Sequence, residues 1–535
     1  MLLTPIVLFV ILMILLYVPP VQNFIRKQAT AIASDATGMN ISVERIDLRF
    51  PLNLLVRGVQ VVQSEADAAD VQHPDTLLNL GSLNVSVQAW PLLQGRVEVN
   101  AITLQQVAVN SSNLLEGMHI KGTLGRFFLE SHGIDLKKED AILNNVELSN
   151  THMQVMLADT TETPKDSTET AVNWRIALHN LKLKNVSVDL QMPLDSMALG
   201  ANIGDASIED ANLDLKRQFY GWRRFTLTES AVNYDLGMAA PVEGFDASHI
   251  ALRDIRIGID SVMACGRDMN AIIREFSMYD RSGLTVTSLT GRLFADSTLI
   301  RIPYLQLKTP HSDMDLTAQT YWKLVDIPTT GHLSARFNAN IGKQDVLLFA
   351  GGLPETFKEA YPFRPLVIHA GTEGNLKQMQ ISRFTAELPG AFFLSGGGEL
   401  WNLTDSLTRN GGLDFEMQTQ DLNFLTGLTG VTPDGSIIVP DSMNLVARLG
   451  LDGPQCNAIL KIKEGEGSLG LDAAYNLNTE VYHADLAIDA LQLHHFLPKD
   501  SIYTLTARVT AKGQGVDVAS HKTIARVEAK LDELQ

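Results

Sequence analysis

The stretch VEVNAITLQQVAV, residues 97–109, sets its apolar side chains at steps of two, three, two, three and two residues. A step of two keeps side chains on one face of a β-strand, because successive residues point to opposite faces. A step of three would turn the next side chain to the other face unless a bulge or a tight bend restores it. The stretch therefore predicts short strands joined by bulges and bends, with these side chains on one face: Val97, Val99, Ile102, Leu104, Val107 and Val109.

The same spacing recurs, which predicts an internal repeat. One full copy is Ile176, Leu178, Leu181, Leu183, Val186 and Val188, and an imperfect one is Ile250, Leu252, Ile255, Ile257 and Ile259. Alternation of this kind, punctuated by turn residues, continues through most of the chain after residue 38. We therefore expect an all-β protein built as a long, repetitive, curled β-sheet with few short helices.

An apolar sheet face must be covered by another layer or left as a groove for an apolar ligand. Predicted helices are too few to form a layer, so an ordinary series of β-sandwiches and an open groove remain as alternatives. We favour the groove, because the pattern continues without domain linkers. Its candidate lining residues are the six of residues 97–109 and the six of the full copy at 176–188.

The amino-terminal 18 residues, MLLTPIVLFVILMILLYV, are uncharged, and the first charged side chain is Arg26. At about 1.5 Å per residue such a run just spans a hydrocarbon core, so residues 1–20 predict a transmembrane anchor. We expect it to be retained, since Arg26 and Lys27 separate it from a small-residue cleavage site at Ala31-Ile32-Ala33. The side chains expected in the membrane are Leu2, Leu3, Ile6, Leu8, Phe9, Ile11, Leu12, Ile14, Leu15 and Leu16.

The hydrophobic pattern divides the rest of the chain into segments. Residues 21–37 predict a short helix, either amphipathic at the membrane surface or capping the end of the sheet. Residues 38–342 and 366–535 predict the repetitive β groove, separated by a helical excursion at 343–365 around Gly351-Gly352-Leu353-Pro354. The acidic segments 64–76 and 159–170 predict solvated loops. The strand pattern still runs at the carboxyl end, so we expect a longer protein.

Composition and motifs argue against several function classes. A net charge of −18 disfavours nucleic-acid binding, because phosphate backbones would be repelled. The chain has two widely separated cysteines and lacks the short sequence motifs of metalloproteases, α/β-hydrolases and P-loop proteins. His494 and His495 would point to opposite faces of a strand, and Asp313 and Asp315 are more typical of a turn than of a calcium site. We therefore expect no enzyme activity, no metal and no cofactor.

Two segments resemble the AsmA/TamB family. ISVERIDLRFPLNLLVRGVQVV (41–62) and LNVSVQAWPLLQGRVEVNAITLQQVAV (83–109) resemble its amino-terminal region, and HHFLPKDSIYTLTARVTAKGQGVD (494–517) resembles TamB-like proteins of Bacteroidota. The predicted apolar anchor followed by a short helix also resembles the amino-terminal organisation of this family. The family's carboxyl-terminal TamB domain is not recognisable in this sequence.

The resemblance implies a location and a function. Members are anchored in the bacterial inner membrane by one helix, with most of the chain in the periplasm as a β-taco groove. They are understood to carry phospholipid toward the outer membrane. The alternative implied by the TamB branch is a scaffold or chaperone for outer-membrane protein assembly with an Omp85-type β-barrel. The partners expected here are thus the membrane, phospholipid and, in the alternative, such a barrel.

Overall fold

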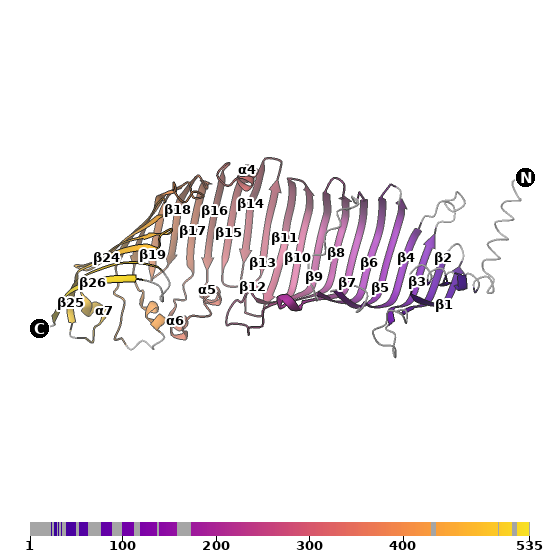
Figure 1. The fold of residues 1–535 in the computed structure, drawn as a ribbon, viewed down its shortest axis with the longest axis horizontal. Coiled ribbons are helices and arrows are strands. Elements are labelled where there is room, and N and C mark those ends of the chain that lie inside the picture. Colours follow the sequence, from indigo (N-terminus) through magenta and orange to yellow (C-terminus); the bar gives the residue numbers. More distant parts are fainter. Residues whose placement is uncertain are drawn as a thin grey trace, which may run out of the picture. The chain divides into compact units, whose positions relative to one another are not determined.

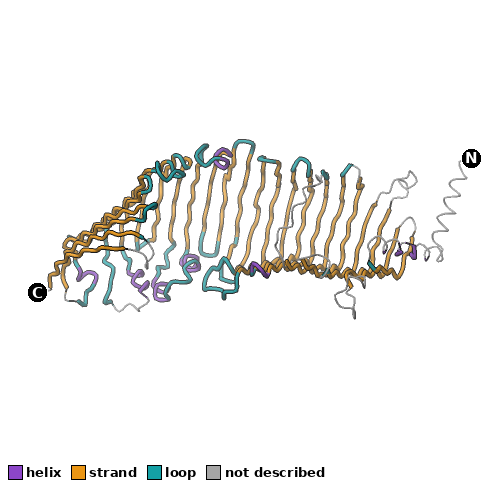
Figure 2. The backbone as a smooth tube through the Cα atoms, in the orientation of Figure 1, coloured by secondary structure: helices purple, strands orange, loops and turns teal. Residues whose placement is uncertain are grey.

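The structure is a computed structural model that describes residues 39–49, 53–62, 76–87, 99–111, 118–135, 138–157, 173–429, 435–500, 502–515 and 522–533, with seven residues between 23 and 34. The chain divides into two compact units. Unit 1 holds residues 1–241 and 246–281, and unit 2 holds residues 242–245 and 282–535. In each unit the strands form an open, curled sheet, shown as a ribbon in Figure 1 and as a tube in Figure 2. The predicted all-β class with a few short helices is confirmed for the described residues.

Unit 1 is an eleven-stranded sheet in sequential order. Its strands are β1 (Asn40–Arg49), β2 (Asn53–Val62), β3 (Thr76–Val87), β4 (Val99–Asn110), β5 (Met118–Asp135), β6 (Asp140–Leu157), β7 (Arg175–Met192), β8 (Met197–Asp214), β9 (Phe219–Leu236), β10 (His249–Cys265) and β11 (Asp268–Asp280), with the 3₁₀ turn η1 at Pro193–Asp195. Neighbouring strands are antiparallel, except that β6 and β7 are parallel. Parallel neighbours need a crossover connection. The acidic segment 159–170 belongs to that connection and, like segment 64–75, lies outside the described residues.

A line of backbone irregularities crosses unit 1 at one level of the sheet. Along this line each of the strands β1 to β10 has a residue that is skipped in the ladder: Glu44, Gly58, Gly81, Gln106, Gly125, Asn150, Asn185, Gly204, Glu229 and Asp254. The skipped residue accounts for the three-residue steps of the sequence, such as Leu104 to Val107, because it restores the original face. These irregularities are not β-bulges, because neighbouring strands skip a residue at the same level of the ladder. They correspond to the predicted bends, and they interrupt continuous strands of up to 18 residues rather than joining short ones.

Residue type along this line follows from backbone geometry. Gln106, Asn150, Asn185, Glu229 and Asp254 have φ between 51° and 56°, in the left-handed region. Several of their neighbours across the ladder are glycines, because a side chain would collide there. A Cβ on Gly81 would lie 2.9 Å from Gln106 Cβ, and one on Gly125 would lie 2.8 Å from Asn150 Cβ. Close backbone approach therefore requires glycine at these positions.

Unit 2 is also built from β-strands, which are shorter than most of those in unit 1. They are β12 (Thr285–Val286), β13 (Ser288–Ala295), β14 (Leu299–Lys308), β15 (Asp313–Tyr321), β16 (Leu333–Ile341), β17 (Leu366–Asn375), β18 (Gln378–Leu388), β19 (Phe392–Trp401), β20 (Asn410–Thr419), β21 (Asn444–Asp452), β22 (Gln455–Glu464), β23 (Gly467–Asn476), β24 (Val481–Leu491), β25 (Ile502–Gln514) and β26 (Lys522–Glu533). From β13 onward each strand pairs antiparallel with the next.

Short helices are inserted between strands of unit 2. α4 (Trp322–Asp326) precedes β16, α5 (Lys343–Leu348) and α6 (Glu355–Ala360) join β16 to β17, η2 (Asn423–Thr429) joins β20 to β21, and α7 (Leu493–Phe496) joins β24 to β25. The helical pattern expected at 343–365 corresponds to α5 and α6. This insertion does not separate two β domains, because β16 and β17 pair directly. The two units divide instead at residues 281 and 282.

Helices α6 and η2 close a small core over one margin of the unit 2 sheet. The rings of Phe357, Tyr361 and Phe424 lie 5.5–5.9 Å apart, and Leu388 beneath them is 1% exposed. Leu388 pairs with Phe392, two residues beyond the Ala386–Leu394 pair, so all four share one face of the sheet. The helices therefore cover that face only at its margin.

Replacing Phe424 with alanine is expected to cost about 3 kcal/mol or more of local stability, because it empties a closed apolar core. Hydrogen exchange of α6, η2 and the adjoining ends of β18 and β19 should then accelerate in the full chain. Leu425→Ala is the matched control, since Leu425 on the same turn is 36% exposed. Equal effects of the two substitutions would contradict this account of the core.

At the amino-terminal side, helical residues contact the edge of β1. Arg26 Nη1 donates to the Glu44 carbonyl oxygen at 2.7 Å, and Ser34 Oγ accepts the Ile41 N–H at 3.1 Å. These bonds support the capping interpretation of residues 21–37, since they satisfy backbone groups of an edge strand. The predicted anchor, residues 1–20, lies outside the described residues. Within the described part of the chain, no helix has the length and apolar character needed to cross a membrane.

Candidate functional site

Two unbroken rows of apolar side chains cross all eleven strands of unit 1. Residues that pair across a ladder project from the same face, so the register defines each row. The first row is Leu48, Leu54, Val85, Ile102, Leu129, Val146, Leu181, Ile208, Phe225, Ile259 and Ile273. The second is Ile46, Val56, Leu83, Leu104, Phe127, Leu148, Leu183, Ala206, Leu227, Ile257 and Phe276. We call this side of the sheet the apolar face.

The register brings most of the predicted lining residues together. Ile102 and Leu181 share the first row, and Leu104 and Leu183 share the second. Cross-strand pairing places Val107, Leu124, Thr151 and Val186 in one further row. It places Val109, Gly122, Met153 and Val188 in another. Val99, Ile176 and Leu178 lie farther along the same strands, each beyond a further break in register. Val97 lies outside the described residues.

Sequence reasoning missed the contributions of β5 and β6. Leu129 and Phe127 on β5, with Val146 and Leu148 on β6, supply the centre of both rows. Gly122 and Thr151 interrupt the apolar spacing in these strands, so they did not match the repeat. A search for the two-three spacing that allowed Thr at one position would have found β6, whereas β5 departs from the spacing at both Gly122 and His132.

Unit 2 has an apolar face of the same construction. One row joins Leu289, Leu307, Met314, Ala339, Ile368, Ala386, Leu394, Met417, Leu445, Ile462, Leu469, Ile488 and Ala507. The next joins Gly291, Leu305, Leu316, Phe337, Ala370, Phe384, Gly396, Phe415, Ala447, Leu460, Leu471, Leu486, Val509 and Val527. Gly396 leaves room for Phe415, whose ring a Cβ would approach to 2.3 Å, and Phe415 packs edge-on against Phe384.

The opposite face of unit 1 is polar. Between the apolar positions the register joins Arg45, Arg57, Ser82, Gln105, Arg126, Ser149, Lys184, Asp205 and Thr228, all of them polar or charged. Farther along this unit, Arg223 bonds both Glu209 and Asp210 at 2.7 Å. Hydrogen bonds from Arg223 and His179 lower the pKa of the Asp210 carboxyl. A sheet with one apolar and one polar face needs a partner only for the apolar one.

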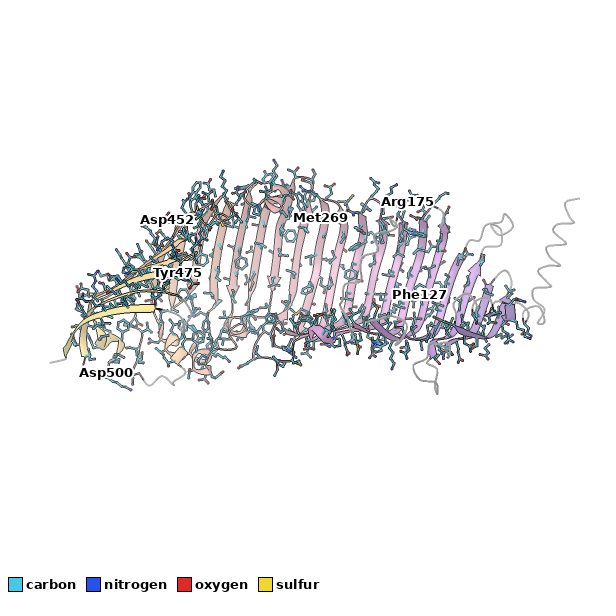
Figure 3. The ribbon with its side chains drawn as sticks, in the orientation of Figure 1. Phe127, Arg175, Met269, Asp452, Tyr475 and Asp500 are labelled. Carbon is cyan, nitrogen blue, oxygen red and sulfur yellow. The ribbon has the colours of Figure 1, made fainter. Side chains whose placement is uncertain are left out.

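The apolar faces remain largely uncovered by the described residues. In unit 1 the described helical residues are those between 23 and 34 and the three of η1, too few to form a layer. Among the described residues, Leu388 is the one large side chain below 2% exposure. A sandwich of the same size would bury many side chains completely. Figure 3 shows the side chains along both sheets, with Phe127 and Tyr475 labelled.

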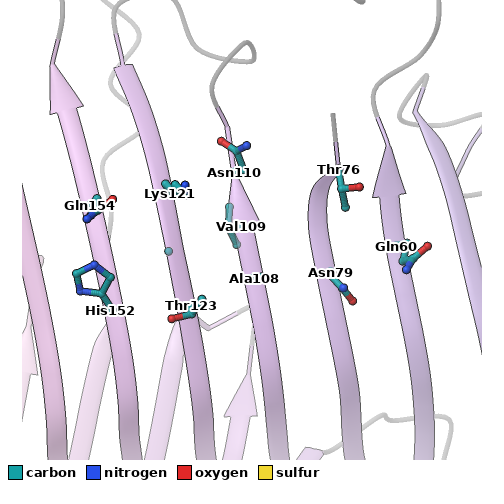
Figure 4. A pocket seen from close by; sticks show the side chains of 11 residues that line it. Gln60, Thr76, Asn79, Ala108, Val109, Asn110, Lys121, Thr123, His152 and Gln154 are labelled. Atoms are coloured by element: carbon teal, nitrogen blue, oxygen red, sulfur yellow. The ribbon is translucent and has the colours of Figure 1, made fainter. Parts of the chain in front are cut away.

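The polar face of unit 1 carries a shallow hollow of about 380 Å³, drawn in Figure 4. Its lining includes Gln60, Asn79, Thr123 and His152, from four strands. His152 Nδ1 lies 2.6 Å from Ser187 Oγ, and its Nε2 lies 3.8 Å from Asp189 Oδ2. A nucleophilic serine also needs donors aimed at the developing oxyanion, whereas the backbone here pairs within the β6–β7–β8 ladders. We therefore assign no chemistry to this cluster.

The placement of His494 and His495 corrects the sequence interpretation. They lie on helix α7 rather than in a strand, and their ring centroids are 4.1 Å apart. His494 stacks on Tyr503, while His495 Nδ1 lies 2.6 Å from Oε1 of the buried Glu464. These contacts of His494 and His495 hold α7 against the sheet. No group of three His, Cys, Asp or Glu side chains among the described residues could hold a metal ion.

Comparison with known proteins gives no identification: neither the protein-family models nor the curated proteins include a match to this chain.

Proposed function

We propose that the apolar faces bind the acyl chains of phospholipid and that the protein transfers lipid along them. The observation that carries this proposal is the set of apolar rows that cross strand after strand within each unit, with a polar face behind and no covering layer among the described residues. An uncovered apolar area of this extent is unusual for a soluble protein and marks an interaction surface. Acyl chains fit it, because the rows offer neither charge nor hydrogen-bonding groups.

The proposed setting follows the resemblance to the AsmA/TamB family. We place the protein in a bacterial inner membrane through residues 1–20, with the bulk of the chain in the periplasm and transfer directed toward the outer membrane. The scaffold function with an Omp85-type barrel is the alternative. A scaffold would pair client strands with a free sheet edge. At the amino-terminal edge this function has less structural support, because backbone groups of β1 already form hydrogen bonds with Arg26 and Ser34.

The test is lipid binding by the full chain. The chain purified in mild detergent is expected to retain phospholipid, identified by mass spectrometry after organic extraction. It should also move a fluorescent phospholipid between vesicle populations, at a rate that rises with protein concentration. Protein that carries no lipid and transfers none would overturn the proposal. Crosslinks from outer-membrane clients to strand edges, in place of lipid on the faces, would favour the scaffold function.

A further inference from the structure

The apolar face of unit 2 contains a hollow. It measures about 590 Å³ and crosses β19 to β24. Its floor is the row Leu413, Leu449, Ala458, Ala473 and Ala484, which pair in turn across the ladder. This volume falls within the roughly 300–1,000 Å³ range of small-molecule pockets. We call it the alanine hollow.

The open volume of the alanine hollow comes from the small size of its floor side chains. On β22, β23 and β24 the floor residues are alanines, so little fills the space above the backbone. One flank carries Leu460, Leu471 and Leu486, and the other carries Cys456, Tyr475 and Tyr482. A ligand lying along β23 would run into Leu471 or Tyr475 within two residues. A ligand lying across the strands follows the alanines without obstruction.

The length of the hollow matches a single acyl chain. Its floor crosses five strands, or about 19 Å at the usual strand spacing of about 4.8 Å. One leaflet of a bilayer core, about 15 Å thick, holds an extended acyl chain. Tyr475 and Tyr482 form a facing pair on β23 and β24. A tyrosine offers an apolar ring to the chain and a hydroxyl to a polar head group, as tyrosines do at membrane interfaces.

We infer that the alanine hollow binds one long acyl chain, oriented across the strands, with its polar end at Tyr475 and Tyr482. This inference rests on the proposed function and adds a location, an orientation and a capacity of one chain. Lipid on the apolar face of unit 2 would then occupy a defined site here, rather than spreading evenly over the rows.

The test uses the full chain and palmitic acid carrying a photoreactive diazirine, with labelled peptides mapped by mass spectrometry. We expect labelling concentrated on β20–β24. Ala484→Phe should reduce it by about tenfold, which corresponds to about 1.4 kcal/mol of binding. Ala487→Phe is the matched control, because Ala487 on the same strand faces the other side, opposite Gly470 and Arg508. Ala458→Leu, a smaller change on the floor, should weaken labelling if Ala484→Phe fails to fold.

The outcomes separate this inference from the general proposal. Labelling of β20–β24 that survives both floor substitutions, with hydrogen exchange of β22–β25 unchanged, would overturn the inference. Labelling of unit 1 without labelling of β20–β24 would also overturn it, while leaving lipid binding by the apolar faces intact. A chain that takes up no label anywhere would count against both.

Discussion

Gly204→Ala is expected to destabilise unit 1 by about 2–3 kcal/mol, although it adds only one methyl group. A Cβ at position 204 would lie 2.4 Å from the Glu229 carbonyl oxygen and 2.7 Å from Glu229 Cβ. Both atoms belong to a strand whose backbone is held by ladders on each side, so neither can move away cheaply. Glu229 itself has φ of 52°, which fixes the direction of its carbonyl group. The strain should therefore spread to β8 and β9.

Hydrogen exchange of β8 and β9 in the full chain measures this effect, because it reports local stability without assuming two-state unfolding. Gly133→Ala is the control within the same unit, since a Cβ on Gly133 meets nothing within 4 Å. We expect its effect to stay within about 0.5 kcal/mol. If both substitutions changed exchange equally, the close approach at the line of irregularities would not be the reason for glycine at position 204.

The need for glycine at these positions cannot be predicted from the residues of one strand alone. The two-three spacing of residues 97–109 predicts the apolar face and the bends that keep side chains on it, because both depend on residues within one strand. The identity of Gly81 depends instead on Gln106, a left-handed residue on the next strand and 25 positions away. A single sequence does not reveal that pairing, since nothing local distinguishes this glycine from a turn glycine.

Other differences between the sequence-based expectations and the structure also arise from contacts between distant residues. The parallel pairing joins β6 and β7, two strands separated in the sequence by an acidic segment without a strand pattern. The division at residue 281 falls between regular strands, whereas the helical pattern at 343–365 is a conspicuous break that lies within one unit. His494 and His495 follow a long alternating segment, which predicts that the strand continues over them, whereas the backbone turns into α7 after Leu491. In each case tertiary contacts, rather than local periodicity, decide the outcome.

The most direct effect on function is expected from Leu183→Glu. Leu183 occupies the second apolar row, paired with Leu148 on β6 and Ala206 on β8. A carboxylate there would have to stay hydrated, because burying an unpaired charge is far more costly than the contacts it could gain. It would hold water in the path of an acyl chain and divide the row on β7. We expect phospholipid transfer between vesicles to fall by about tenfold or more, the effect of a barrier at least about 1.4 kcal/mol higher.

Lys184→Glu provides the control, because the next residue of β7 projects from the polar face, between Ser149 and Asp205. It introduces the same side chain on the same strand, one position away. It should leave the transfer rate within about twofold of the unaltered chain, since solvated surface substitutions change stability by only about 0.5 kcal/mol. Hydrogen exchange of β6–β8 would establish that both variants retain the sheet. If Leu183→Glu folded and transferred lipid as fast as Lys184→Glu, acyl chains would not travel along this row, and the apolar face would need another occupant.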